Sequence, residues 1–487
     1  MKDVGTFGLI VLVVAGAAIV AVLSNRLAER IRVPAPAIFL IAAAVLSDLA
    51  PSLYDLSTTT VQRIVTVALA IILFDGGMHI GMARLRSAAG AIVWLGVVGT
   101  AVTTAGVALI AHALLGLGAK ISLVLGTALA PTDPAVVFSV LGNREVRGRA
   151  GTILEGESGA NDPVGIALMI GLLTASGSGA RLALGVAQQF ALEMAIGLAI
   201  GVVGGVLLLA FMRRIPLPNA ALYPIRALAG ALVLYGVATV AHGSGFLAVF
   251  VAGIVVGDER APYKAEIERF CSSLATLGEI VAFAVLGLTV HLSHFRHGHA
   301  LGYGLAIAAL LALVVRPVLG GLVLAAIGLS RPERIFVLWS GLKGAVPILL
   351  GSFVLSSGIA HAAEVYDVIA VVVAFSVIVQ GGLVPTIARR VGVPMRAVEP
   401  EPWAAGLRLR DEPQGLHRYV VEAGSAADGS AVRDLAVGES LWISIVTRAG
   451  RLVPVGSDLV LHAGDEVLAL TDPGDEIDPA PVFRGDE

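Results

Sequence analysis

Stretches of about 20 apolar residues recur along almost the whole chain, and this pattern restricts the fold more than any other feature. Windows of that length fall near residues 5–25, 33–50, 61–80, 88–114, 120–141, 152–174, 183–212, 220–241, 244–257, 272–291, 301–328, 333–357 and 366–388. Because only helices and closed barrels satisfy every backbone polar group in lipid, the pattern predicts an all-α polytopic membrane protein with about 13 transmembrane helices.

The composition agrees with a chain that lies mostly in lipid. Of its 487 residues, 57% are hydrophobic and 14% are charged, whereas soluble domains carry about 25% charged residues. The net charge of −3 provides no basic stripe for phosphates, so a nucleic-acid partner is not expected. The single cysteine, Cys271, excludes an intramolecular disulfide. We therefore expect membrane lipid as the main surroundings and no cofactor.

Basic residues in the predicted loops indicate the topology. With the amino terminus outside, the inside loops hold clusters such as 26–32, 84–86, 144–149 and 389–396, while outside loops hold single basic residues. Cytoplasmic loops carry such an excess of Lys and Arg. The bias predicts a plasma-membrane protein, in a bacterial inner membrane, with its amino terminus outside and its carboxy terminus in the cytoplasm.

The character of the sequence changes after residue 395. We predict a transmembrane domain over residues 1–395, a linker over 396–407, a small cytoplasmic α+β domain over 408–473 and an acidic tail over 474–487. Within the small domain, alternating residues predict strands at 418–422, 442–447, 452–455, 458–461 and 465–470, with a short helix at 430–435.

Two predicted spans of opposite direction are interrupted near their middles. Pro131 and Pro134 flank Thr132-Asp133 in one span, and Gly344 and Pro347 follow Lys343 in the other. Paired interrupted helices indicate a transporter with inverted repeats and a site near the midplane. A carboxylate such as Asp133 suits the amino-terminal ends of the half-helices, and a cation such as Lys343 suits the carboxy-terminal ends.

Asn161-Asp162 lies well inside the span 152–174. An ionisable group at that depth costs about 2.5–3.5 kcal/mol on insertion scales and is kept mostly where ions or protons are handled. Ser158 lies four residues before Asp162 and so shares its helix face. A proton and a monovalent cation would compete for this one carboxylate, while the alternative is a structural carboxylate bonded through Asn161. No metal other than a transported monovalent cation is predicted.

Other charges fall in apolar runs. Arg316 keeps its charge and needs an anion, and we expect Glu157 to be its structural partner. Asp75, in Phe74-Asp75-Gly76-Gly77, is a further candidate acid that either lines the site or pairs locally. Glu193 and Glu279 are expected to make only helix contacts or to extend toward the membrane surface.

The motifs around Asp75, Thr132-Asp133, Glu157 to Asp162 and Lys343 together resemble the sodium/hydrogen-exchanger type of cation:proton antiporter. The resemblance covers residues 1 to about 395. It implies that Asp162 binds cation and proton alternately, with Asn161, Ser158, Thr132 and Asp133 in the same site. The family often has Glu where this chain has Asp75.

The resemblance also implies a homodimer and one-for-one exchange, the latter from the Asn-Asp form of the motif. Residues 419–468 resemble the TrkA-C (RCK C-terminal) domain, which implies a small regulatory ligand of unspecified class. This combination of a transmembrane domain with a TrkA-C-like domain resembles the potassium/proton antiporter subgroup, so K⁺ is favoured over Na⁺ as the exchanged cation.

Two other functions fit the sequence less well. A sodium-coupled solute symporter can be built on the same broken-helix architecture, and substrate-dependent Na⁺ uptake without a pH change would distinguish it. A ligand-gated cation channel needs a selectivity filter, and no Thr-Val-Gly-Tyr-Gly-like loop is present. An enzyme is not expected.

Overall fold

The computed structural model describes residues 35–49, 57–141, 144–146, 149–175, 177, 179–259, 261–290, 299–397, 415–435, 441–448, 451–471 and 480–483. The chain divides into two compact units, Met1–Val398 and Glu399–Glu487, and each is described by itself. The predicted first span, at 5–25, lies outside the described residues.

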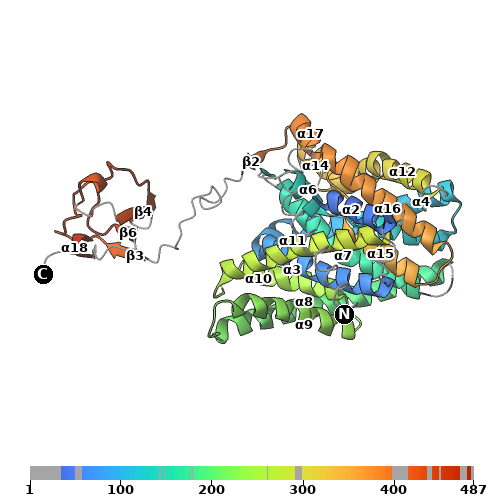
Figure 1. The fold of residues 1–487 in the computed structure, drawn as a ribbon, viewed down its shortest axis with the longest axis horizontal. Helices are drawn as coiled ribbons and strands as arrows, with labels where there is room; N and C mark the ends of the chain where they lie inside the picture. The colour runs from blue at the N-terminus through green and yellow to red at the C-terminus, as the bar shows by residue number, and fades with distance from the viewer. Residues whose placement is uncertain are drawn as a thin grey trace. The chain divides into compact units, whose positions relative to one another are not determined.

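The first unit is built mainly from helices (Figure 1), and several of them are continued by a π-helical stretch (η). In chain order they are α2 (Ala35–Leu49), α3 (Thr58–Val93), η2 (Trp94–Gly99), α4 (Thr100–Leu115), α5 (Ala119–Leu129), α6 (Pro134–Leu141), α7 (Arg149–Thr174), α8 (Gly179–Arg214), α9 (Leu222–Val240), α10 (Gly245–Gly257), α11 (Lys264–Thr289), α12 (Ala300–Leu310), η4 (Leu311–Gly320), α13 (Gly321–Ala325), α14 (Arg331–Trp339), α15 (Ala345–Ser356), α16 (Ala362–Phe375), η5 (Ser376–Gly381) and α17 (Gly382–Val391).

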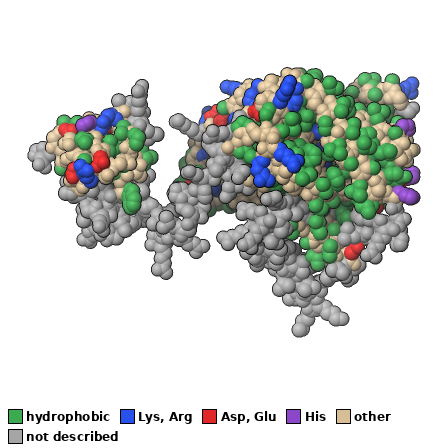
Figure 2. All heavy atoms as spheres, turned by 90° about the horizontal axis from the view of Figure 1, so that it is seen from above, with side chains coloured by type: hydrophobic (Ala, Val, Ile, Leu, Met, Phe, Trp, Pro, Cys, Tyr) green, Lys and Arg blue, Asp and Glu red, His purple; other side chains and the backbone are tan. Residues whose placement is uncertain are grey.

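Each predicted span from the second onward overlaps one or more of these helices, and the spans 61–80 and 88–114 share α3. Six helical segments of the described chain are both long and apolar enough to cross a membrane. Apolar side chains cover much of the visible face of this unit (Figure 2). α11 begins at Lys264, eight residues before the predicted start at 272. The prediction missed these residues because Glu266, Glu268 and Arg269 lower the hydropathy of the first turns.

α3 holds the predicted span 61–80 and the first residues of the next one, 88–114, and its helical path is broken between them at Gly81. This glycine has φ 62° and ψ 173°, a backbone conformation that side chains disfavour. The carboxylate of Asp258 lies where a Cβ on Gly81 would stand, and it accepts a hydrogen bond from the Ala83 backbone N–H. That bond satisfies a donor at the start of the new helical segment. The turn therefore needs both the glycine and the acid.

Small residues let neighbouring helices approach closely. α10 packs against α3 and α8, and Gly77 of α3 and Gly253 of α10 each lie against the backbone of the other helix, with no room for a Cβ. Such contacts supply packing energy where the hydrophobic effect does not drive helix association. α3 and α10 therefore pack backbone against backbone at these glycines.

A short two-stranded sheet joins distant segments of the first unit. β1 (Arg144–Val146) pairs antiparallel with β2 (Met395–Ala397), with Glu145 opposite Arg396. The predicted linker 396–407 therefore begins too early, since Arg396 and Ala397 belong to β2. Backbone pairing with β1 is a tertiary contact that local composition does not reveal.

The second unit holds a four-stranded antiparallel sheet in the order β3-β6-β4-β5. Its strands are β3 (Gly415–Val420), β4 (Leu441–Arg448), β5 (Arg451–Val453) and β6 (Glu466–Thr471). The predicted strand at 458–461 is reduced to one bridge between Ala431 and Val460. The predicted helix at 430–435 is a single 3₁₀ turn, Val432–Asp434.

A short helix near the end of the sequence packs onto this sheet. α18 (Ala480–Phe483) buries Phe483 fully, and its ring stacks on Tyr419 with centroids 4.8 Å apart. Glu422 and Ala427 donate backbone hydrogen bonds to Phe483 and Val482. Residues 480–483 are thus part of the small domain, contrary to the prediction of a separate acidic tail from 474, because the side chains of Val482 and Phe483 pack into its core.

Candidate functional site

The first broken span consists of α5 and α6, separated by residues 130–133. α5 ends at Leu129 and α6 begins at Pro134. Proline is favoured at the first helical position, where its missing N–H is not needed. Pro131 and Pro134 therefore leave Thr132-Asp133 as non-helical backbone in the middle of a span.

The second broken span consists of α14 and α15, separated by residues 340–344. α14 starts with a capping box between Ser330 and Glu333, which satisfies its first backbone donors. α15 starts at Ala345, and its N-cap Gly344 has φ −106° and ψ −141°. Lys343 lies in the non-helical stretch between the two helices.

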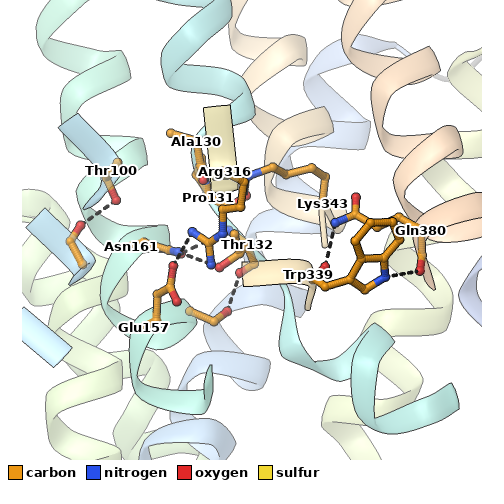
Figure 3. A network of polar contacts seen from close by, with 12 residues as sticks. Thr100, Ala130, Pro131, Thr132, Glu157, Asn161, Arg316, Trp339, Lys343 and Gln380 are labelled. Atoms are coloured by element: carbon orange, nitrogen blue, oxygen red, sulfur yellow. Dashed lines mark hydrogen bonds and ion pairs between the residues drawn. The ribbon is translucent and has the colours of Figure 1, made fainter. Parts of the chain in front are cut away.

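The two breaks cross and bond to each other. The Asp133 backbone N–H donates to the Leu342 carbonyl over 2.8 Å. The Lys343 ammonium donates to the carbonyl oxygens of Ala130 at 2.9 Å and Pro131 at 3.1 Å, at the carboxy-terminal end of α5 (Figure 3). A cation stabilises such an end because the last carbonyls lack intrahelical donors.

Asp133 lies at the opposite pole of the crossing. Its carboxylate occupies the position that a Cβ on Gly344 would take, so it stands directly before the amino terminus of α15. Negative charge is favourable there because the first N–H groups of a helix point outward. The crossing thus places one acid and one base on the helix ends that each one stabilises.

α7 holds the first break through its side chains. Ser158 Oγ donates to the Thr132 carbonyl at 2.5 Å, and Asn161 Nδ2 donates to Thr132 Oγ1 at 2.8 Å. The Thr132 backbone N–H donates to Asn161 Oδ1 at 3.3 Å (Figure 3). These bonds use every polar group of Thr132, so Ser158 and Asn161 fix the unwound residue in this conformation.

Asp162 is the next residue on α7, and one oxygen of its carboxylate makes no hydrogen bond to any described residue. The residue is 8% exposed, and Oδ1 has no hydrogen-bond partner among the described residues. Asp133 and Lys343 are the charged side chains that act on it most strongly. Pro163 follows and has no N–H, so the Gly159 carbonyl loses its usual helical donor. A free carboxylate oxygen here is available to a proton or a cation.

The structure pairs Glu157 with Arg316. Arg316 Nη1 lies 2.6 Å from Glu157 Oε1, and the two side chains are 8% and 3% exposed. Gly341 lies flat against the guanidinium, where a Cβ would collide with Nε and Cζ. The ion pair therefore connects α7 and η4 to the second break.

Three polar residues of this region were not predicted from the sequence to belong to the site. Ser376 Oγ accepts from the Lys343 backbone N–H at 2.9 Å and donates to Gln380 Oε1 at 3.2 Å. Gln380 Nε2 donates to the Trp339 carbonyl, and Trp339 Nε1 donates back to the Gln380 carbonyl. Ser376 and Gln380, four residues apart in an apolar run, were the available signal.

These groups border a small cavity. Arg316, Lys343, Ser376 and Gln380 line it together with apolar residues, and its volume of about 10 Å³ is near the minimum that holds one water. Arg316 Nε and Nη2 have no protein partner among the described residues. The cavity provides room for a water to solvate those donors.

Asp75 does not join the polar cluster at the crossing. Its Oδ1 accepts from Ser272 of α11 at 2.9 Å, and its Oδ2 lies 3.5 Å from His79 Nδ1. Ser272 and His79 are thus local partners of Asp75. The other predicted site residues, from both breaks and from α7, lie together.

Residues 14–390 match the family described as sodium/hydrogen exchanger, transmembrane. This match covers well over half of the chain. The chain belongs to the sodium/hydrogen exchanger family.

Known members of this exchanger family extend the likeness. The chain is 31% identical over 480 residues to the K(+)/H(+) antiporter NhaP of Alkalimonas amylolytica, covering 98% of this chain and 83% of the relative. It is 29% identical over 349 residues to the Na(+)/H(+) antiporter NhaH of Halobacillus dabanensis, covering 68% and 83%. The sodium proton antiporter MjNhaP1 of Methanocaldococcus jannaschii shares the fold, with TM-score 0.67, 20% identity, and coverage of 80% of this chain and 99% of that chain. The exchanger is thus a membrane transporter rather than an enzyme.

Proposed function

We propose that this exchanger transports K⁺ in one direction and H⁺ in the other, and that Asp162 binds the two ions alternately. The single observation that carries the proposal is Oδ1 of Asp162, which is buried where two broken helices cross and has no hydrogen-bond partner in the described part of the chain. An uncompensated carboxylate in such surroundings is unfavourable, so a proton or a cation that neutralises it is bound. Ser158, Asn161 and Thr132 hold the frame around it.

The charges at the crossing support one-for-one exchange. Asp133 and Lys343 compensate opposite helix ends, and Arg316 compensates Glu157. Of these five side chains, Asp162 then contributes the one uncompensated negative charge. One proton or one monovalent cation restores neutrality, which makes the two ions mutually exclusive at the site.

K⁺ is proposed over Na⁺ because a K(+)/H(+) antiporter matches nearly the whole chain, including the second unit. The Na(+)/H(+) antiporter NhaH matches over 68% of it. Ligand type does not separate the two cations, since both take oxygen ligands. The choice of K⁺ therefore rests on the match of the second unit, together with the first, to a protein named as a K⁺ transporter.

The test uses purified protein in vesicles with a trapped pH dye and an acidic interior. Addition of KCl outside should alkalinise the interior, while NaCl and LiCl give a much smaller response and choline chloride none. Asp162→Asn should abolish the response with the fold retained. Glu193→Gln is the matched control, because it removes another buried carboxylate, one that accepts from Gln189 on α8, and it should exchange normally. Full exchange by Asp162→Asn would overturn the assignment of Asp162.

The second unit is proposed to be a cytoplasmic TrkA-C-like regulator in a homodimer, with a small ligand controlling transport. Deletion of residues 399–487 should leave K⁺/H⁺ exchange intact and remove its response to cell extracts of small molecules. An inactive deletion variant with a folded membrane unit would instead show that the second unit is needed for transport itself. Cross-linking in native membranes tests the dimer.

A further inference from the structure

α11 carries a polar stripe along one face, although most of the helix is apolar. Glu268, Ser272, Thr276 and Glu279 follow each other at spacings of four, four and three residues. At about 100° per residue, these four side chains fall within about 80° of one another. A hydroxyl or carboxyl thus recurs at every turn from the first part of the helix to its middle.

The stripe is open toward the Lys264 end of α11 and closed at its inner end. The Glu268 side chain is 43% exposed, Thr276 is exposed and Ser272 is half-buried. Asp75 of α3 lies beside the stripe, where its carboxylate accepts a hydrogen bond from Ser272. One turn beyond Glu279, the same face carries Phe283, which is fully buried. Polar groups therefore lead inward and stop at Glu279.

Glu279 stands next to the crossing of the broken helices. Its Oε1 is inaccessible to solvent and has no partner among the described residues, and Asp133 is the charged side chain that acts on it. α11 packs against α15, whose N-cap Gly344 contacts Asp133. Thr132 and Asn161, the chain neighbours of Asp133 and Asp162, bond to each other, so both acids lie at the crossing.

The expectation that Glu279 makes only helix contacts or extends to the membrane surface does not fit this position. It lies 15 residues from Lys264 and ten from Thr289, which is about 22 Å and 15 Å along the helix. A glutamate side chain is too short to reach either end of the helix. A mid-membrane carboxylate without a partner is costly and is retained for function by default.

We propose that the face of α11 formed by Glu268, Ser272, Thr276 and Glu279, with Asp75, is the route by which the cation reaches Asp162 from the Lys264 end. Glu279 contacts the cation at the inner end of this route and sets its apparent affinity. The proposal rests on the cation/proton exchange proposed above and adds a residue to it. Carboxylate and hydroxyl oxygens replace part of the hydration shell of a cation along the way.

The first experiment maps the route with cysteines. Cys271 is the single native cysteine and is buried, so Cys271→Ala provides a background for Thr276→Cys and Phe283→Cys. A charged, membrane-impermeant thiol reagent should modify the Thr276→Cys variant from the Lys264 side only, and this should block exchange. The Phe283→Cys variant should remain unmodified. A Thr276→Cys variant that is unreactive from both sides, in a chain that still exchanges, would show that this face meets lipid and would overturn the route.

The second experiment measures exchange at varied K⁺ concentrations. Glu279→Gln should raise the K⁺ concentration for half-maximal exchange about tenfold, the effect of losing one favourable ion contact, with the maximal rate within about twofold. Glu279→Asp should fall between, and Glu193→Gln should match the wild type. An unchanged half-maximal concentration in Glu279→Gln would refute the role of Glu279.

The variants also separate this inference from the proposed function. Loss of exchange in Asp162→Asn, together with wild-type affinity in Glu279→Gln, would leave the antiporter assignment standing and remove only Glu279. Absence of exchange in the wild type would remove both. If Glu279→Gln does not fold, Glu279→Asp and the Thr276→Cys labelling decide the matter.

Discussion

Breaking the Glu157–Arg316 pair should destabilise the protein strongly, because both charges are buried. Glu157→Gln keeps the shape of the side chain and leaves the Arg316 charge uncompensated, with Nε and Nη2 already lacking protein partners among the described residues. Loss of one partner of a buried pair costs about 3–5 kcal/mol. An unfolding entropy of about 2.1 cal/mol/K per residue gives about 0.8 kcal/mol/K for Met1–Val398. The melting temperature should therefore fall by about 4–6 °C.

An exposed pair of equal length provides the control. Arg213 and Glu259 also lie 2.6 Å apart, but their side chains are 42% and 50% exposed. Because exposed pairs contribute about 0–1 kcal/mol, Glu259→Gln should lower the melting temperature by about 1 °C or less.

The assay is the melting of purified protein in detergent, followed by size-exclusion chromatography after heating. The double variant Glu157→Gln/Arg316→Met should recover most of the loss, since it leaves no buried charge behind. Equal melting temperatures for Glu157→Gln and Glu259→Gln would refute the argument from burial. A double variant less stable than Glu157→Gln would refute the argument from the uncompensated charge.

Two further predictions concern the crossing and the second unit. Lys343→Met should impair exchange and lower the melting temperature, because two buried carbonyls at the end of α5 lose their donor, at about 1–3 kcal/mol each; wild-type stability and exchange would contradict this. Hydrogen bonds from Arg448 lower the pKa of Asp465, so its stabilising contribution is complete above the unfolded-state pKa of about 3.9 and is lost as pH falls through the lower folded-state pKa. In the whole chain, pepsin cleavage of the second unit should rise as the pH falls through that folded-state pKa. The Asp465→Asn variant should be cleaved faster already above this pH, and the exposed Asp458→Asn variant should be cleaved like the wild type. Equal cleavage of the three proteins would contradict the stabilising role of Asp465.

Much of the helical unit follows from hydropathy. A run of about 20 apolar residues becomes a helix in lipid because no other backbone conformation satisfies its own polar groups there, so the spans from the second onward overlap helices. The breaks at Pro131 and Gly344 were also predictable, since proline and glycine interrupt helices by local chemistry. Where hydropathy was diluted by charge, as at the start of α11, the boundary was wrong.

The small domain was less predictable, and for a related reason. Its strands are short, and their pairing depends on partners distant in the sequence. Val460 had the local pattern of a strand but makes only one bridge, while Phe483 lies in an acidic stretch and enters the core. Strand formation reflects tertiary packing more than local preference.

The sequence by itself determined that charged and amide side chains lie inside membrane spans, because the cost of burying them makes each one informative without any structure. It did not determine which of them act on one another. Only the tertiary structure places the Lys343 ammonium on the carbonyls at the end of α5 and binds Asn161 and Ser158 to Thr132. It also leaves one oxygen of Asp162 without a hydrogen bond to any residue that the structure describes. The reason is physical: hydropathy is a property of each residue in its segment, whereas a hydrogen bond or an ion pair depends on distances of a few ångströms between segments that are far apart along the chain.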